Sequence, residues 1–435
     1  MNLRLSRRQA DRRGLRLWPV GIALAAAFAI AVLVAAAVFY AGWDLLGARG
    51  LKSEPRLDSK TFFDLVKIAF GVVAGAGALV ALVVAYRRQR VEEDGALRDA
   101  TRLHTERFTT AVSQLDASPA VRLGGVHALA GLADDAPTRE LRQTCIDVLC
   151  AYLRLPYTAL TDLPRGDAAA RHEYLALREV RRTVIRVIRD HLRLPREHHH
   201  SWQGHDLDLT GVVFDSGDFS RAVFCGGIVN FSGARFLHGT IDLRGAEFRG
   251  GTVDFSSATF DGCVVNFSSA KFSGGAVDFS RARFSNTGTV FFDRAVFSGG
   301  AVEFRSAVFG VNSWLGFRAA AFSGGLVTFI GAEFDGGTLD FDGAGFCGSA
   351  VHFSGAEFSG GAVGFHGATF SGGLVTFGAA AFDGCAVDFD GAGFSGGTVD
   401  FAAASGRPPG GLVPPPGDPL PAGLILAAAW QPAGP

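Results

Sequence analysis

Four histidines near the middle of the chain form its densest group of side chains that could bind a metal ion. They are His198, His199, His200 and His205. Zinc sites in proteins combine imidazole with thiolate or carboxylate ligands at fixed spacings. Consecutive side chains on an irregular segment do not converge on one ion, and no Cys or carboxylate stands at a ligand spacing from these four. We therefore expect residues 195–205 to be a solvated linker, with zinc binding as the alternative, and assign no metal site.

The cysteines and carboxylates also form no catalytic arrangement. The six cysteines show neither CxxC spacing nor disulfide-rich density, so we expect reduced thiols that act as small core residues. Asp and Glu in the second half recur with the period of a repeat and should face solvent. No P-loop, nucleophile elbow or metal motif is present. We predict that the protein is not an enzyme and has no catalytic residue, cofactor or small-molecule substrate. The cysteines are Cys145, Cys150, Cys225, Cys263, Cys347 and Cys385.

Two apolar stretches, residues 17–40 and 68–86, are long enough to cross a bilayer. A bilayer core about 30 Å thick needs about 20 residues of helix. A secretory signal is the alternative for the first stretch, but its apolar run is long and no small-x-small cleavage site closes it. We predict two transmembrane helices joined by a short outer loop, 41–67. Gly71 and Gly75 form a GxxxG motif in the second, which would suit a homodimer.

The distribution of arginine predicts the orientation of these helices. Residues 1–16 contain six Arg, and three more follow the second span, whereas residues 41–60 of the loop carry four basic residues diluted by three acidic ones. Basic residues favour the cytoplasmic side of a membrane. We predict a multi-pass protein of the plasma membrane whose N-terminal and C-terminal regions are both cytoplasmic. The preference for Arg over Lys is typical of a GC-rich bacterial genome.

Residues 94–194 have the apolar period of amphipathic helices. Ser118 followed by Pro119 is a good helix start, because the hydroxyl can cap and proline is tolerated in the first turn. A second start is expected at Asp135-Ala136-Pro137, and a third helix from about Asp167 to Leu192. Short helices in antiparallel pairs predict a small α-helical hairpin domain.

From Leu209 to Phe401 the chain is a repeat of large apolar residues, mostly Phe. The first steps are five residues long, and the interval then alternates between seven and five, giving a twelve-residue unit. Two eight-residue steps interrupt it, one ending at Phe292 and one at Phe317. Self-similarity at a fixed period predicts a solenoid, which we place at residues 206–401.

The residue types within each unit predict which side chains point inward. A Val stands two residues before one Phe, as at Val351 and Phe353, and a small residue stands two before the next, as at Ala356. Residues two apart on an extended backbone face the same side, so these should be buried, while Glu357 should face water. The Gly-Gly pairs should supply the corners, since they reach conformations closed to other residues. Those pairs are 274–275, 299–300, 324–325, 360–361, 372–373 and 396–397.

Five-residue steps with a small residue two before each Phe or Leu resemble the pentapeptide-repeat family. This resemblance implies a right-handed quadrilateral β-helix. Segments 122–135 and 147–154 are similar to a bacterial membrane-anchored subgroup with two N-terminal transmembrane helices before the repeats. The chain departs from the simple family pattern in the two extra residues, often Gly-Gly, after every second pentapeptide.

Those extra residues leave two arrangements for a coil of the solenoid. Two units can share one coil with enlarged corners, giving about eight coils and roughly 40 Å of length, or each unit can close its own flattened coil in a rod about twice as long. We favour the first, because the opening five-residue steps already set a four-sided register. Residues 402–435, rich in Pro, are expected to be a disordered tail, with residues 424–430 covering the open edge of the last coil as the alternative.

Charge and repeat together narrow the function. The repeats from Asp206 to Phe401 hold twenty Asp or Glu against ten Lys or Arg, and no basic residue follows Arg318 within them. The leading hypothesis is a non-catalytic scaffold for a protein partner on the cytoplasmic face of the membrane. The alternative comes from the resemblance: some soluble members of the family mimic DNA and bind gyrase. A purely structural role is the third, and we expect no direct binding of nucleic acid.

Overall fold

The computed structural model describes residues 58–164, 166–285, 287–408, 412–413 and 419–431, and between 25 and 44 only residues 25, 28–30, 32–33, 36–37, 40–41 and 43–44. The chain divides into two compact units, residues 1–101 and 102–435, and each is considered by itself. Most of the predicted first span, 17–40, lies outside the described residues, and those described within it are helical.

The second predicted span lies inside one long helix, α2 (Ser59–Gln114). Within the described residues, one helix, Phe62–Gln114, is long and apolar enough to cross a membrane. The sequence predicted separate elements at 68–86 and from 94 onward, but the helix continues between them. Residues 87–93 contain Arg, Gln and Glu, which are good helix formers, and Arg88 lies 2.9 Å from Glu92 one turn later.

Three further helices follow in the second unit, α3 (Pro119–Asp134), α4 (Arg139–Arg154) and α5 (Ala168–Arg193), with a short 3-10 turn, η2 (Leu160–Asp162), before the last. The predicted starts of α3 and α5 are confirmed. The Asp167 carboxylate caps α5 by accepting the N–H groups of Ala169 and Ala170, both at 3.0 Å. Helix α4 starts later than expected, because the Thr138 hydroxyl caps it by accepting the Leu141 N–H at 3.3 Å.

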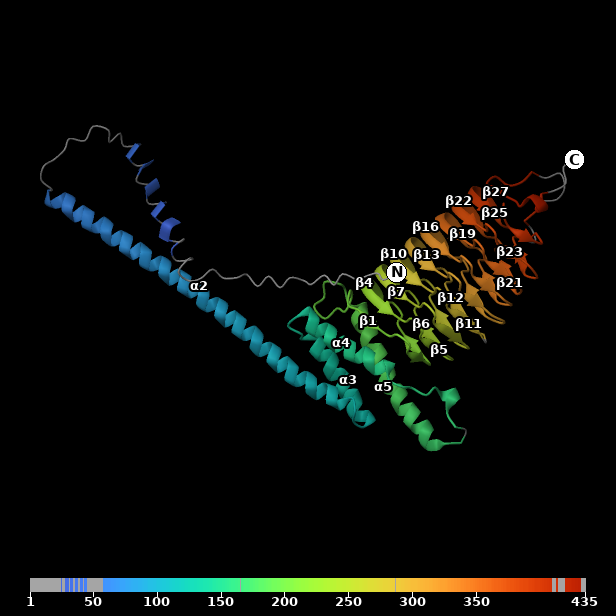
Figure 1. The fold of residues 1–435 in the computed structure, drawn as a ribbon, viewed down its shortest axis with the longest axis horizontal. Coiled ribbons are helices and arrows are strands. Elements are labelled where there is room, and N and C mark those ends of the chain that lie inside the picture. Colours follow the sequence, from blue (N-terminus) through green and yellow to red (C-terminus); the bar gives the residue numbers. More distant parts are fainter. Residues whose placement is uncertain are drawn as a thin grey trace, which may run out of the picture. The chain divides into compact units, whose positions relative to one another are not determined.

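The rest of the second unit is a solenoid of parallel strands (Figure 1), arranged in three sheets of ten, nine and eight strands. Sheet A contains β1 (Leu207–Asp208), β4 (Val223–Asn230), β7 (Glu247–Asp254), β10 (Lys271–Asp278), β13 (Val296–Glu303), β16 (Ala321–Thr328), β19 (Gly345–His352), β22 (Thr369–Thr376), β25 (Gly393–Asp400) and β27 (Leu424–Ile425). Sheet B contains β2 (Val213–Phe214), β5 (Arg235–Leu237), β8 (Thr259–Asp261), β11 (Arg283–Ser285), β14 (Val308–Phe309), β17 (Glu333–Phe334), β20 (Glu357–Phe358), β23 (Ala381–Phe382) and β26 (Ser405–Gly406). Sheet C contains β3 (Gly217–Asp218), β6 (Thr240–Asp242), β9 (Val264–Asn266), β12 (Thr289–Phe291), β15 (Trp314–Gly316), β18 (Thr338–Asp340), β21 (Ala362–Gly364) and β24 (Ala386–Asp388).

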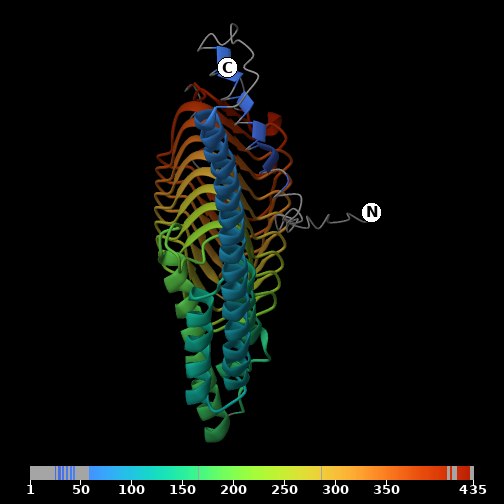
Figure 2. The same cartoon turned by 90° about the vertical axis from the view of Figure 1, so that its left-hand side faces the viewer.

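Each coil holds two twelve-residue units, as favoured from the sequence. Lys271 pairs with Glu247 in the coil before it, a separation of 24 residues, and the stack has about nine turns (Figure 2). The two eight-residue steps both fall between sheets B and C, where each adds one residue to a corner, and Lys271 therefore pairs with Val296 in the next coil. Because the insertions occupy the same corner of adjacent coils, the register of the sheets is kept. The right hand of the coil and its quadrilateral section stay predictions.

The interior is filled by four stacks of rings, one residue per coil in each. Neighbouring rings within a stack lie nearly parallel, as for Phe329, Phe353 and Phe377, whose successive centroids are 4.7 Å apart. Phe353, Val351 and Ala356 are fully buried and Glu357 is exposed, so the predicted inward and outward positions are confirmed. The four stacks start at Phe214, Phe219, Phe224 and Phe231, and in the second of them Leu243 takes the place of a ring between Phe219 and Phe267.

The prediction that the Gly-Gly pairs form the corners of the coil is wrong for most of them. Five of the six pairs lie within strands of sheet A, and only 360–361 lies between strands. The reason is the spacing of the buried residues. Phe272 and Val277 are both buried but are five residues apart, so strict alternation would place them on opposite faces. A bulge must absorb the odd residue, and the register of β10 shifts there. Gly275 takes the positive φ, 74°, that this bulge requires.

The described part of the tail closes the last coil rather than extending from it. Strand β27 pairs with β25, and Trp430 is buried against Phe382 and Phe401. The Trp430 indole N–H donates to the Gly406 carbonyl at 2.9 Å. Of the two expectations for residues 402–435, the structure favours the cover over the disordered tail for residues 419–431.

The cysteines divide into three groups. Two of the six, Cys225 and Cys385, are only half-buried. Cys145, Cys150 and Cys263 are buried, as expected for small core residues, and burial raises the pKa of the Cys150 thiol to about 12. Cys347 is exposed, contrary to the prediction. It occupies the outward position on β19 that Ser323 holds on β16, where a side chain meets solvent.

Candidate interaction surfaces and a cleft at the first coil

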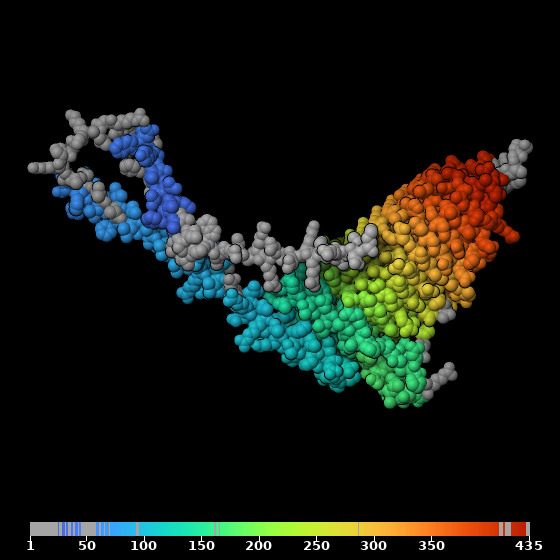
Figure 3. Space-filling model, viewed as in Figure 1, coloured from blue at the N-terminus to red at the C-terminus, as the bar shows by residue number. Residues whose placement is uncertain are grey.

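The outer face of sheet A is broad and, along most of the stack, uncharged at its centre. On β13 the first three outward residues are Val296, Ser298 and Ala301. From β13 onward, the equivalent outward positions of each eight-residue strand hold only Gly, Ala, Val, Leu, Ser, Thr or Cys. Figure 3 shows one face of the solenoid as an unbroken surface of stacked coils. The centre of such a face offers a partner contact area that carries no charge.

Charged outward residues follow a different pattern along the stack. In the earlier coils they form ion pairs, such as Arg244 with Asp242 at 2.6 Å and Arg305 with Glu303 at 2.8 Å. Arg318 is the last basic residue of the repeats, and it pairs with Asp340 at 2.5 Å. Of the acidic residues beyond it, Asp340 and Asp342 lie near Arg318, and the others form no ion pair among the described residues. Glu333 lies directly opposite Glu357 in sheet B.

The helices of the second unit cover the first coil of the solenoid (Figure 1), and their basic residues meet its acids. Arg154 pairs with Asp208 and Arg189 with Asp218. The buried guanidinium of Arg181 donates to the Leu153 and Val213 carbonyls, both at 2.6 Å, and so ties α4 to β2 across α5. The helical domain therefore closes the open edge at the start of the solenoid, as the tail does at its end.

Two tyrosines complete this junction. The hydroxyls of Tyr157 and Tyr174 donate to the same oxygen of Asp215, at 2.7 and 2.6 Å. Burial and the hydrogen bond to Asp215 raise the pKa of both phenols, so both stay protonated donors. Sequence reasoning missed these residues, because Tyr157 lies outside the predicted helices and nothing in the helical period of α5 marks the contact of Tyr174 with Asp215.

His191, near the end of α5, has an acceptor at each ring nitrogen. Its Nδ1 lies 2.7 Å from the Val187 carbonyl oxygen, and its Nε2 lies 3.1 Å from the Asp134 carboxylate. Its ring stacks on that of the buried Trp202, with centroids 4.2 Å apart. Because both nitrogens must donate, this geometry holds the cationic form of histidine. Asp190 and His200 also face the pair, His200 at 3.7 Å from Asp134.

We expect the folded state to lose stability as the pH rises through the pKa of His191. Burial alone would lower that pKa, but Asp134 and the Val187 carbonyl outweigh burial and raise it above its ordinary value. A raised pKa stabilises the fold fully below about pH 6.5, the value in the unfolded chain, and the contribution disappears as the pH rises through the higher folded value. Urea unfolding at pH 6 to 8.5 should show this decline in the wild type, and His191→Gln should flatten it.

Two other histidines change the stability of the fold with pH in the opposite direction, so their contribution must be distinguished from that of His191. Burial lowers the pKa of His104, and burial with Arg139 and Arg142 lowers that of His205 to about 4. These two destabilise the fold only below about pH 6.5, where the unfolded chain takes up their protons. A wild-type decline above pH 6.5 that persists in His191→Gln would contradict the assignment to His191.

The histidine-rich segment is only partly the solvated linker that the sequence predicted. His198 and His199 are exposed, but Trp202 and His205 are buried, and the His205 Nδ1 lies 2.9 Å from the Gln143 side-chain oxygen. The rings of the three consecutive histidines pack together on the surface, with centroids 3.9 to 5.3 Å apart. Among the residues that the structure describes, no group of three His, Cys, Asp or Glu side chains is arranged to hold a metal ion.

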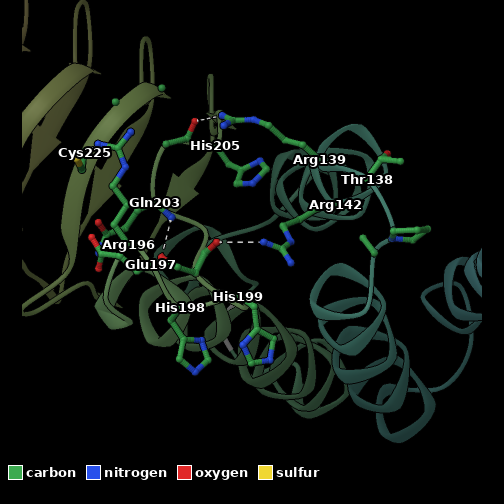
Figure 4. A pocket seen from close by; sticks show the side chains of 16 residues that line it. Thr138, Arg139, Arg142, Arg196, Glu197, His198, His199, Gln203, His205 and Cys225 are labelled. Carbon is green, nitrogen blue, oxygen red and sulfur yellow. Dashed lines mark hydrogen bonds between the residues drawn. The ribbon is translucent and has the colours of Figure 1, made fainter. Parts of the chain in front are cut away.

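This segment forms one wall of a cleft of about 670 Å³ beside the first coil (Figure 4). The start of α4 forms a second wall with Arg139 and Arg142, and the bulge of β4 forms a third with Cys225 and two glycines. These residues are up to about ninety positions apart in sequence and follow no common motif, so no sequence signal could have gathered them.

Comparison with known proteins adds no closer identification, because no family model matches the chain and no curated protein matches it. What the structure establishes is a parallel β-solenoid with a Phe at about every fifth residue, which is consistent with a pentapeptide-repeat protein.

Proposed function

We propose that this protein is a membrane-anchored, non-catalytic scaffold of the pentapeptide-repeat kind, with a right-handed quadrilateral β-helix that presents its faces to a protein partner in the cytoplasm. The observation that carries the proposal is the combination, in one chain, of an apolar helix without a burying partner and a rod with uncharged flat surface. The subgroup with two N-terminal transmembrane helices fits this combination best.

Helix α2 supports the anchor. Within residues 62–86 no described side chain is buried, and Ile68, Phe70 and Leu82 are 68, 71 and 68% exposed. Burying a large apolar side chain is worth about 1.5–3 kcal/mol, so a helix of this composition is stable when lipid surrounds it. With residues 17–40 as a second span, the arginine distribution supports a topology in which both ends of the chain are cytoplasmic.

We expect a charge placed on the neutral face of sheet A to abolish partner binding. Ser298 is exposed on β13, and Ser298→Arg would oblige a partner to desolvate a charge within a flat contact. Ser306→Arg is the matched control, because Ser306 is an exposed turn residue whose equivalent in the coil before is already Arg281. Proximity labelling from the tagged protein in its native membrane, followed by capture with each variant, measures the effect.

The result that would count against the scaffold is equally specific. If labelling recovers no reproducible neighbour, or if both arginine variants retain the same neighbours, sheet A is not the docking face. If alkaline carbonate extracts the protein from membranes, the protein is not integral and the proposed membrane anchor is wrong.

A second candidate rests on the acidic residues beyond Arg318. Glu333 and Glu357 lie opposite each other on sheet B without a basic neighbour in the repeats, as the phosphates of a DNA strand would. On this candidate the rod would mimic DNA for an enzyme such as gyrase. A supercoiling assay in which the purified protein leaves gyrase activity unchanged would eliminate it.

A further inference from the structure

The cleft beside the first coil carries more positive charge than the residues around it neutralise. Three guanidinium groups line it, those of Arg139, Arg142 and Arg196, against the single lining carboxylate of Glu197. None of the three arginines forms an ion pair with a carboxylate in the described part of the chain. Arg154 and Arg189, at the same junction, pair with Asp208 and Asp218, so these acids neutralise arginines outside the cleft and not the three within it.

Neutral acceptors hold these guanidinium groups in place. Arg139 donates to the Gly204 carbonyl, and Arg142 donates to the Ala133 carbonyl at 2.7 Å. Arg196 reaches the Cys225 sulfur at 3.4 Å from the other side of the cleft (Figure 4). Each guanidinium has five N–H donors, so these contacts fix the side chains and leave further donors for a ligand.

Two more observations show that the cleft favours an anion. His205 is buried next to it, and burial, with a further contribution from the nearby Arg139 and Arg142, lowers the pKa of His205 to about 4, although Asp206 acts in the opposite direction. The imidazole is therefore neutral at cytoplasmic pH. The first turn of the sixteen-residue helix α4, from Thr138, also lines the cleft, and the N-terminus of a helix is the positive end of its dipole.

We propose that this cleft binds a ligand through a phosphate group that lies between Arg139 and Arg196. The volume is that of a small-molecule site rather than of a single ion, since such sites range from about 300 to 1,000 Å³. Arginine forks match the geometry of phosphate oxygens and give bidentate contacts. The phosphate belongs to a soluble phosphorylated compound or to a lipid headgroup. This site is independent of the scaffold proposal, because it touches sheet A only at β4 and uses neither the face from β13 onward nor the membrane helices.

The experiment titrates the full-length protein, purified in detergent, by calorimetry with two probes at constant ionic strength. Inorganic pyrophosphate represents the soluble source, and dioctanoyl phosphatidate represents the lipid headgroup. We expect at least one probe to bind with a dissociation constant below about 1 mM. The tighter of the two identifies the source.

Three variants locate the site. Arg139→Gln and Arg196→Gln should each weaken binding about tenfold or more, the effect of losing one charge-assisted contact. Arg139→Gln also loses the hydrogen bond to the Gly204 carbonyl, which could disturb folding. Arg196→Gln does not change that bond, so it tests the site even if Arg139→Gln misfolds. Arg281→Gln removes one exposed positive charge from a distant turn and should leave the affinity within about twofold of the wild type. Binding of neither probe, or equal affinity in all three variants, would overturn the proposal.

Discussion

We expect Phe353→Asp to unfold the central coils of the solenoid and Glu357→Lys to leave them intact. Phe353 is fully buried, with the rings of Phe329 and Phe377 4.7 Å away on either side. The substitution removes both ring contacts and buries an unpaired carboxylate, which should cost more than about 4 kcal/mol. Each coil is stabilised by its neighbours, so a break in one stack should propagate to the coils beside it.

Glu357→Lys is the matched control, because it inverts a charge four residues away on the exposed side of the same coil. Its effect should stay within about 0.5 kcal/mol, as for other surface changes. It can even stabilise slightly, since Glu357 faces Glu333 across sheet B. Hydrogen exchange measured on peptides from the central coils distinguishes the variants. Equal protection in both would show that the inward and outward assignments do not govern stability.

The solenoid could be predicted in detail because its information is local and repeated. The position that Phe353 occupies has the same kind of neighbours in each coil. The spacing of Phe along the sequence therefore predicts which residues face inward and how many residues form a coil. The bulge in sheet A could also have been found from the sequence. Phe272 and Val277 are both apolar and an odd number of residues apart, which alternation alone cannot bury on one face.

The junction and the cleft could not be predicted, because their residues meet only through the fold. Asp215 and its two tyrosine donors come from three segments, and nothing in the repeat period marks Asp215 as different from other acids in the solenoid. The same is true of Arg139, which reaches the Gly204 carbonyl 65 residues further along the chain. A domain boundary at residue 194 concealed the contact, since a predicted linker implies that the two sides do not touch.

For the tail, the argument from the open edge of the last coil gave the correct prediction, and the argument from composition gave the wrong one. An open edge of a parallel solenoid needs a cover, and this requirement pointed to residues 424–430. Proline content pointed instead to disorder. Proline is compatible with the short β27 and the buried Trp430, because the tail needs only two strand residues and one large side chain to close the coil.

Gly300→Ala should destabilise the solenoid by about 3 kcal/mol or more, although it adds a single methyl group. Gly300 sits in the bulge of β13 with a φ of 74°. A Cβ there would lie 2.6 Å from the Gly275 carbonyl oxygen of the coil below, and that oxygen belongs to backbone that cannot turn aside. The stacked bulges would have to separate, which lengthens the hydrogen bonds of sheet A on both sides.

Gly343→Ala is the control that lacks the steric part of this effect. Gly343 has a similar positive φ, 65°, but a Cβ there would meet nothing within 4 Å. One coil earlier, Ala319 already holds the same turn position with a φ of 53°. Only the cost of an alanine at positive φ remains, about 1 kcal/mol. Urea unfolding followed through Trp314 and Trp430 should therefore give a midpoint well below the wild type for Gly300→Ala and a small shift for Gly343→Ala. Equal shifts would mean that backbone strain, and not the close stacking of glycines between coils, explains why sheet A keeps its Gly-Gly pairs.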